Sequence, residues 1–173
     1  TAEGIIKGFI FDSNIATKSQ GGALYINQAD VDISTSIFKK NQAPYGGAIL
    51  MFLNGHLSVS ESRLEDNQAG KLGGAICSQS PTEISECNFL NNASVSGGAI
   101  YSRAQTSISR SEFAENTAND GGAIDHDFAS LFITEAKFEG NVATKQDGAI
   151  LLRKNGKAEI SETKFTSNDS GSE

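Results

Sequence analysis

Residues 84–124 read ISECNFLNNASVSGGAIYSRAQTSISRSEFAENTANDGGAI, and this stretch contains the same unit twice. Each copy runs through Ile-Ser, then Phe-x-x-Asn, then Gly-Gly-Ala-Ile. The first copy begins at Ile84 and the second at Ile108. A unit of about 25 residues is too short to bury an apolar face by itself, so its copies must stack on one another. The stretch therefore predicts a repeat protein.

The Phe-x-x-Asn unit recurs along the whole chain at steps of 24 to 27 residues. One of its seven copies carries Leu in place of Phe. Stacking the units places ring over ring in the core and amide over amide at a bend, so we expect these residues to be structural. The first and last residues of the copies are Phe11 and Asn14, Phe38 and Asn41, Leu64 and Asn67, Phe89 and Asn92, Phe113 and Asn116, Phe138 and Asn141, and Phe165 and Asn168.

A Gly-Gly-Ala-Ile/Leu unit alternates strictly with the first one. Gly permits positive φ and close approach of two backbones, so we expect the pairs to shape tight bends between closely spaced coils. The last of the six copies replaces its first Gly with Asp147. The copies are Gly21, Gly22, Ala23 and Leu24; Gly46, Gly47, Ala48 and Ile49; Gly73, Gly74, Ala75 and Ile76; Gly97, Gly98, Ala99 and Ile100; Gly121, Gly122, Ala123 and Ile124; and Gly148, Ala149 and Ile150.

The apolar residues alternate over four to six positions between polar or Gly-rich breaks, which is the period of strands and not of helices. The Ile of each Ile-Ser pair has the wrong parity to share a flat strand with the following Phe, so the chain must bend near Ile-Ser. We predict an all-β fold, a right-handed parallel β-helix with three short strands per coil, whose handedness follows the rule for parallel crossovers. One repeat domain covers residues 1–173, with coils at approximately 6–32, 33–58, 59–83, 84–107, 108–132, 133–159 and, in part, 160–173.

Charged residues at outward positions agree with this register. Stacking predicts a ladder of Glu86, Arg110 and Glu135, and places Glu112 beside Lys137. The net charge is -7, and an acidic surface repels phosphate backbones, so we expect no nucleic-acid partner. No apolar run is long enough for a transmembrane helix, and the first residues do not resemble a signal peptide. Because the pattern begins and ends in mid-repeat, we expect a fragment of a longer protein.

Thirteen motif copies in strict alternation resemble the polymorphic membrane proteins of chlamydiae, over essentially the whole chain from Phe11 to Asn168. These are autotransporters, with the repeats in a passenger region and a separate outer-membrane barrel, which we do not expect among these residues. The resemblance implies a bacterial surface adhesin, displayed or secreted after processing, that binds a host cell-surface protein receptor and promotes entry. The family's repeated motifs are themselves associated with adhesion. The copies at Leu64 and Asp147 depart from the pattern.

One carboxylate–histidine cluster, Asp125-His126-Asp127, invites comparison with β-helix enzymes that degrade polysaccharides. No second cluster recurs one coil away to make a paired-carboxylate site, and strand alternation splits the three side chains between two faces. We therefore interpret the cluster as a solvated turn, and His56, beside Asn54-Gly55, as a loop residue. The sequence predicts no catalytic residue, no metal site, no cofactor and no small-molecule substrate.

The two cysteines do not form a disulfide framework. Cys87 occupies a small inward position and is expected to be a buried thiol. Cys77 follows Ile76 and should face outward, either free or available for a cross-link to another protein. A bond between the two cysteines would need the two faces to meet, which is not expected.

The least repetitive segments lie between Gly-Gly-Ala-Ile and the next Ile-Ser. Leu50 to Leu53 form an apolar run there that we expect to be partly exposed. Variable loops on a rigid scaffold are common recognition sites, so Phe52 and Tyr101 are candidate contacts. Two alternatives to adhesion remain, a polysaccharide-degrading enzyme and a structural spacer. Open ends of the β-helix would also favour self-association.

Overall fold

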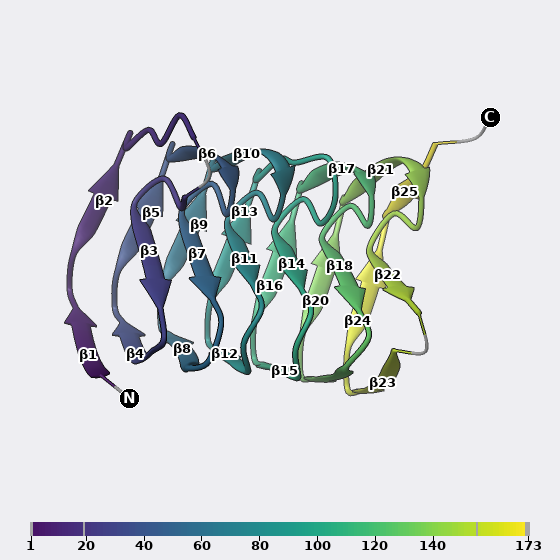
Figure 1. The fold of residues 1–173 in the computed structure, drawn as a ribbon. Helices are drawn as coiled ribbons and strands as arrows, with labels where there is room; N and C mark the ends of the chain where they lie inside the picture. Colours follow the sequence, from purple (N-terminus) through teal and green to yellow (C-terminus); the bar gives the residue numbers. More distant parts are fainter. Residues whose placement is uncertain (1, 19, 155, 172–173) are drawn as a thin grey trace.

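The computed structural model describes residues 2–18, 20–154 and 156–171. Within them the chain winds as a rod of stacked coils, with the two termini at opposite ends (Figure 1). All regular elements among these residues are strands, and each pairs in parallel with the equivalent strand of a neighbouring coil. The predicted parallel β-helix is confirmed. Among the described residues no helix has the length and apolar character needed to cross a membrane.

The first long side of the rod is the β1–β23 sheet, which contains the Ile-Ser segments. Ile84 pairs with Val59 on one side and with Ile108 on the other, so equivalent residues stack in register. Its seven strands are β1 (Ala2–Lys7), β4 (Ala29–Ser34), β8 (His56–Ser60), β12 (Thr82–Ser85), β15 (Thr106–Ser109), β19 (Ser130–Thr134) and β23 (Lys157–Ser161).

The second side is the β2–β24 sheet, whose central residues are the motif Phe and Leu side chains. Phe89 pairs with Leu64 and Phe113. Its seven strands are β2 (Ile10–Asp12), β5 (Ile37–Lys39), β9 (Arg63–Glu65), β13 (Asn88–Leu90), β16 (Glu112–Ala114), β20 (Lys137–Glu139) and β24 (Lys164–Thr166).

The third side is the β3–β22 sheet, where each strand begins at the Ile or Leu of a Gly-Gly-Ala-Ile/Leu unit. Ile100, for example, pairs with Ile76 and Ile124. Its six strands are β3 (Leu24–Asn27), β7 (Ile49–Phe52), β11 (Ile76–Ser78), β14 (Ile100–Ser102), β18 (Ile124–Asp127) and β22 (Ile150–Arg153).

Each coil has a fourth strand position, directly after the motif Asn. The sequence-based prediction of three strands per coil did not include this fourth strand position. Two short sheets occupy it, and isolated bridges at Ala93 and Ser96 connect them across the coil between. The strands are β6 (Gln42–Tyr45), β10 (Gln68–Leu72), β17 (Thr117–Asp120), β21 (Val142–Gln146) and β25 (Asp169–Ser170).

Besides the first position of the glycine pair, two residues with positive φ turn the chain in each complete coil. One follows Ile-Ser, as at Glu86 with φ 54°, which places the predicted bend one residue after that pair. The other is the third residue of Phe-x-x-Asn, as at Asn91 with φ 53°. These single left-handed residues reverse the face on which the next side chains lie, so both the Ile and the Phe point inward.

Aromatic rings form the core column that the sequence predicts. The rings of Phe89 and Phe113 stack with centroids 4.6 Å apart and an interplanar angle of 3°, and Phe138 continues the stack at 4.7 Å. Leu64 interrupts the column and is fully buried between Phe38 and Phe89. Stacking at the strand spacing therefore places every central ring out of contact with water.

The motif Asn residues form a directional hydrogen-bond ladder. Nδ2 of Asn92 donates to Oδ1 of Asn116 at 3.0 Å, and Nδ2 of Asn116 donates to Oδ1 of Asn141 at 2.9 Å. Each interior amide also donates to a backbone carbonyl, as Asn116 Nδ2 does to Phe89 O at 3.0 Å. The ladder thus satisfies amides that have no exposed surface.

The two glycines of a pair are required for different structural reasons. The first has positive φ in the four central copies, 64° at Gly97 for example, and Asp147 takes the same conformation with φ 51°. The second lies against the next coil, so a Cβ atom on Gly98 would be 2.0 Å from Gly122 O. Asp tolerates the left-handed conformation, which explains why the first position accepts it.

Surface charges follow the predicted register in part. Arg110 Nη2 lies 3.0 Å from Glu86 Oε1, and Lys137 Nζ lies 3.1 Å from Glu112 Oε1. Arg110 makes no ion pair with Glu135 among the residues described, so the proposed three-residue ladder is only one pair. Such exposed pairs add little stability, typically about 0.2–1 kcal/mol each.

Candidate functional site

The repeated motifs lie mostly inside the rod. The Phe and Leu side chains of the five central Phe-x-x-Asn copies are at most 1% exposed, and their Asn side chains are fully buried. The Ala of each central glycine unit is buried as well. Phe165 in the last coil is 46% exposed because nothing stacks beyond it. In the central coils these residues therefore form the scaffold and are not accessible at the surface.

The outer face of the β3–β22 sheet carries the least regular side chains of the molecule. Its strands alternate, so the Ile at the start of each points inward and the next residue points outward. The outward column runs through Tyr25, Leu50, Cys77, Tyr101, Asp125 and Leu151. This column is apolar over the first four strands and begins to carry charge at β18.

A second hydrophobic cluster covers the apolar part of this face. Leu50, Cys77 and Tyr101 are 5%, 1% and 6% exposed, and Tyr45, Phe52 and Leu72 pack against them. Cys77 points out of the coil as predicted, and of the two alternatives left open the free thiol is confirmed, because these neighbours bury it and leave no access for a cross-link. Burial raises the pKa of the Cys77 thiol to about 12, so it is unreactive at neutral pH.

The two candidate contacts both belong to this cluster. They lie on strands and not on loops, Phe52 at the end of β7 and Tyr101 in β14. Tyr101 is buried, so its expected role as an exposed loop contact is wrong. Phe52 is half-buried and Leu53 is 42% exposed, so the apolar run at residues 50–53 is partly exposed as predicted.

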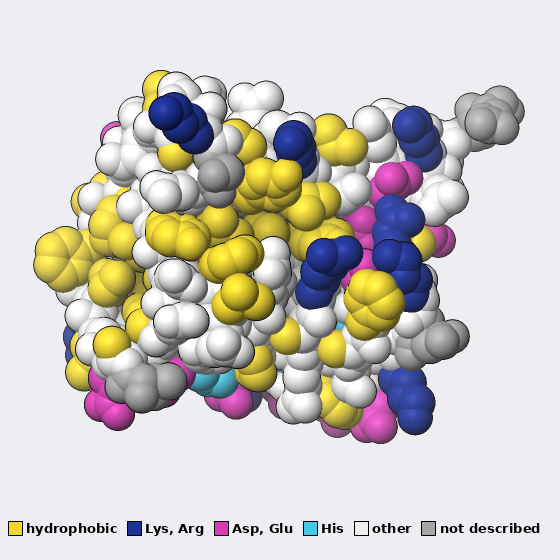
Figure 2. Space-filling view, viewed as in Figure 1, with side chains coloured by type: hydrophobic (Ala, Val, Ile, Leu, Met, Phe, Trp, Pro, Cys, Tyr) yellow, Lys and Arg dark blue, Asp and Glu magenta, His cyan; other side chains and the backbone are white. Residues whose placement is uncertain are grey.

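A groove of about 450 Å³ opens between the aromatic side chains of this face. Figure 2 shows hydrophobic side chains gathered across the middle of the face, with Lys, Arg, Asp and Glu toward the C-terminal coils. The groove takes residues from at least four coils and two sides of the rod. Its lining consists of Gln20, Tyr25, Tyr45, Leu50, Phe52, Leu72, Gln79 and Arg103.

The charged end of the face centres on Asp125 and Asp127, which were expected in a solvated turn. That expectation is wrong: both lie in β18 and are at most 1% exposed. Arg153 Nε is 2.9 Å from Asp125 Oδ1. Arg103 Nε and Lys154 Nζ lie 3.5 and 3.4 Å from Asp127 Oδ2. Burial raises the pKa of Asp125, and Arg153 opposes that rise. Cations from neighbouring coils thus compensate two buried acids.

His126 points to the opposite side of β18, into the coil interior, as strand alternation predicts. It is fully buried, and neither ring nitrogen has a hydrogen-bond partner of good geometry. Burial lowers the pKa of His126, against smaller opposing effects of the Ala129 backbone and Asp127. The imidazole is therefore held neutral in the core.

Phe128 marks the rim of the charged end. It is 55% exposed and has φ 73°, a conformation that bulky residues rarely adopt. Lys154 Nζ lies 4.6 Å from its ring centroid and the Arg103 guanidinium carbon 5.8 Å. The ring thus sits between two cations at the surface, in cation–π geometry.

Comparison with known proteins agrees with this architecture. The family model described as right handed beta helix region matches residues 7–135. The chain belongs to the right-handed β-helix family. No curated protein and no solved structure matches the sequence.

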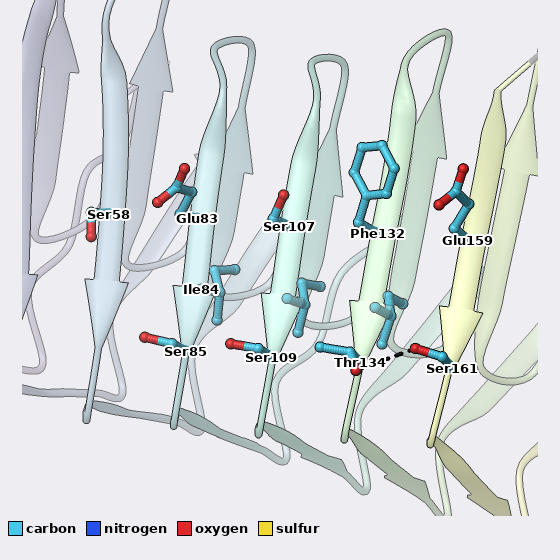
Figure 3. Close-up of a pocket in the computed structure, with 12 residues that line it drawn as sticks. Ser58, Glu83, Ile84, Ser85, Ser107, Ser109, Phe132, Thr134, Glu159 and Ser161 are labelled. Atoms are coloured by element: carbon cyan, nitrogen blue, oxygen red, sulfur yellow. Dashed lines mark hydrogen bonds between the residues drawn. The ribbon is translucent and has the colours of Figure 1, made fainter.

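A second, shallower groove of about 300 Å³ lies on the outer face of this β-helix along the β1–β23 sheet. Figure 3 shows Glu83, Ser107, Phe132 and Glu159 in one row across it, beside a row of hydroxyl side chains. Glu83 and Glu159 lie on β12 and β23, three strand steps apart, which corresponds to roughly 14 Å at the usual spacing. Glycosidase carboxylates lie about 5–9.5 Å apart, so this pair does not fit that chemistry.

The remaining sequence-based assignments concern the histidines, cysteines and metals. His56 begins β8 instead of lying in a loop, and its Nε2 is 3.6 Å from Glu83 Oε1. Cys87 is a buried free thiol as predicted, and burial raises its pKa to about 11. Within residues 2–18, 20–154 and 156–171, no group of three His, Cys, Asp or Glu side chains could hold a metal ion.

Proposed function

We propose that this β-helix is the binding rod of a bacterial surface adhesin, which attaches to a protein on a host cell through one side of the rod. The observation that carries the proposal is the aromatic groove on the outer face of the β3–β22 sheet. Its aromatic side chains lie outside the coil interior, and Tyr25 at its edge is 42% exposed.

The composition of this face is typical of a protein-binding surface. Tyr and Arg are enriched among the residues that contribute most to binding energy, and Phe is enriched at interface cores. Such residues act as anchors that fill pockets in the partner. Tyr25, Phe52 and Arg103 supply these residue types around the groove. Tyr25 and Phe52 project from hydrogen-bonded strands, so little backbone freedom is lost when they bind, and Arg103 directly follows β14.

The repeat pattern supports a location on the bacterial surface. Alternating Phe-x-x-Asn and Gly-Gly-Ala-Ile units resemble the passenger regions of chlamydial polymorphic membrane proteins, which are exposed outside the cell. We accordingly place this chain on the passenger side of the outer membrane, as a non-enzymatic binding protein without a cofactor. Because the motif residues are buried, we propose that they support adhesion indirectly, by maintaining the surface that makes contact.

Attachment of protein-coated beads to cultured human epithelial cells tests this function. Beads carrying the folded chain should attach in a saturable way, and soluble chain should compete. Beads carrying a right-handed β-helix of unrelated surface provide the control. Attachment no greater than that control, by protein with an intact β-sheet circular dichroism spectrum, would favour a structural spacer and reject the proposal.

A further inference from the structure

The aromatic groove has the features of a site for one particular kind of protein segment. We infer that it binds an apolar side chain of an extended, acidic segment of the partner protein, and that Arg103 binds a neighbouring carboxylate of that segment. This inference rests on the proposed function and specifies the partner's chemistry.

The shape and lining of the groove fit an apolar side chain. Leu50 forms a nearly buried base, while Tyr25 remains 42% exposed at the edge. Phe52 lies 6.3 Å from Tyr25, ring centroid to ring centroid, with the planes tilted by 35°. A volume of about 450 Å³ falls within the usual range for sites that enclose a compact group. Filling it would remove apolar surface from water on both partners.

The charge around the groove selects an acidic segment. Although the chain has a net charge of -7, none of the described residues that line the groove is acidic, and Arg103 is among them. The Arg103 side chain is 46% exposed, and its closest approach to Asp127 is 3.5 Å, from Nε to Oδ2. Nearly half of this cationic side chain therefore lies at the surface beside the groove. Lys71 adds a second cation, with Nζ 3.2 Å from Tyr45 Oη. A guanidinium presents paired donors to a carboxylate.

The same lining favours a peptide over a sugar. Five of its eight residues are aromatic or aliphatic, and the side-chain polar groups are two Tyr hydroxyls, two Gln amides and one Arg. Lys71 Nζ already donates to one of these hydroxyls, that of Tyr45. A sugar has a hydroxyl on nearly every carbon, and each buried hydroxyl needs a hydrogen-bond partner. An apolar side chain flanked by carboxylates needs few hydrogen-bond partners inside the groove. The mostly apolar lining of the groove suits such a side chain better than a sugar.

Peptide probes test the chemistry directly. Acetyl-Glu-Leu-Glu-amide should perturb the NMR signals of Tyr25, Leu50 and Phe52 as it is titrated into the protein. Acetyl-Lys-Leu-Lys-amide and acetyl-Glu-Ser-Glu-amide should each bind at least about tenfold more weakly, because each lacks one of the two recognised features. Absence of binding by the first peptide, or equal binding by all three, would overturn the inference.

Paired variants locate the site. Phe52→Ser and Arg103→Gln should each weaken binding of the first peptide by about tenfold or more. Phe132→Ser on the β1–β23 face and Arg110→Gln beside Glu86 are the matched controls and should bind like the unmodified protein. Thermal melting of all four variants shows whether a loss reflects misfolding.

The cell assay separates failure of this inference from failure of the proposed function. If unmodified beads attach but Phe52→Ser and Arg103→Gln beads attach equally well, the chain is an adhesin and the groove is not its contact. If attachment survives trypsin treatment of the cells but is lost after removal of acidic sugars, the partner is a glycan and the inference is wrong. If unmodified beads do not attach, the proposed function fails, whatever the peptides show.

Discussion

Asn116 illustrates how much one side chain contributes to this rod. Its amide takes part in four hydrogen bonds: it donates to Asn141 Oδ1 and Phe89 O, and its Oδ1 accepts from the backbone and side-chain nitrogens of Asn92. The side chain has no contact with water. A buried group with this many partners is costly to remove, because the partners are left unpaired.

Replacing Asn116 with Ala should therefore lower the free energy of unfolding by about 3 kcal/mol or more, at about 1 kcal/mol for each lost bond. Asn88→Ala is the matched control, because Asn88 is exposed in the neighbouring strand and should change stability by less than about 0.5 kcal/mol. Urea unfolding followed by circular dichroism measures both. Equal losses for the two variants would contradict a stabilising ladder.

His126 should make the stability of the rod dependent on pH. Its pKa is lowered in the fold, so below about pH 6.5 the unfolded chain binds a proton that the folded chain does not. The free energy of unfolding is then greatest above that pH and falls as the pH drops from 7.5 to 5.5.

The variant His126→Leu should remove most of this dependence and raise stability at pH 7.5 by on the order of 1–2 kcal/mol, since two unpaired polar atoms leave the core. His56→Asn is the control, because His56 is half-exposed and its loss should leave the pH dependence in place. Denaturant titrations at both pH values measure the effect. A pH dependence that survives in His126→Leu would assign it to other groups.

At the scale of elements, the glycine pairs decide whether two coils can stack. Gly98→Ala would place Cβ 2.0 Å from Gly122 O and 2.7 Å from the Thr117 nitrogen. Neither atom can move without breaking the sheet, so we expect a loss of on the order of 4 kcal/mol or failure to fold.

The matched control for this substitution is Gly70→Ala. An added Cβ there would meet only Pro44 Cα, at the ordinary contact distance of 3.7 Å. Thermal melting should place this variant close to the unmodified protein. A stable Gly98→Ala variant would mean that the coils can separate locally, which the close backbone approach opposes.

The sequence predicts three of the four strand positions because their residues alternate clearly between apolar and polar. It does not predict β6, β10, β17, β21 and β25, whose only regular inward residue is a small one such as Ala43 or Ala118. A single Ala among polar residues gives no period of two. The fourth strand is therefore set by its neighbours and not by its own pattern.

The candidate site was less predictable than the fold. Phe52 was identified from an apolar run, but Tyr45 and Leu72 come from the unpredicted fourth side, so the groove could not be assembled from the sequence. Burial of Asp125 depends on Arg153, which lies one coil away, 28 residues later. Local composition indicates a polar turn there, whereas the register with β22 supplies the cation.

At the scale of the molecule, both end coils expose surface that central coils bury. Ile5 and Ile10 are 81% and 65% exposed at one end, and Ile160 and Phe165 are 42% and 46% exposed at the other. The strands of each end coil pair on one side only. Unpaired parallel edges favour association with another copy.

We therefore expect concentration-dependent oligomers of this chain, joined head to tail. Light scattering coupled to size-exclusion chromatography should show a mass that rises with concentration. Ile10→Lys at the end coil should reduce the association, whereas Leu53→Lys, on the side of the rod and 42% exposed, should not. A strict monomer at every concentration would contradict this expectation.

The constant register between coils also bears on how such a protein can change by inheritance. Each ladder joins a coil only to the coil before it and the coil after it. Loss of residues 84–107 by unequal recombination would bring Asn116 beside Asn67 and Phe113 beside Leu64, the partners that Asn92 and Phe89 have now. A deletion that removed only part of a coil would leave that coil without some of the residues that continue the columns, because equivalent positions recur once in 24 to 27 residues. Lineages carrying this fold should therefore gain and lose whole coils, while the sequence on the sides diverges freely.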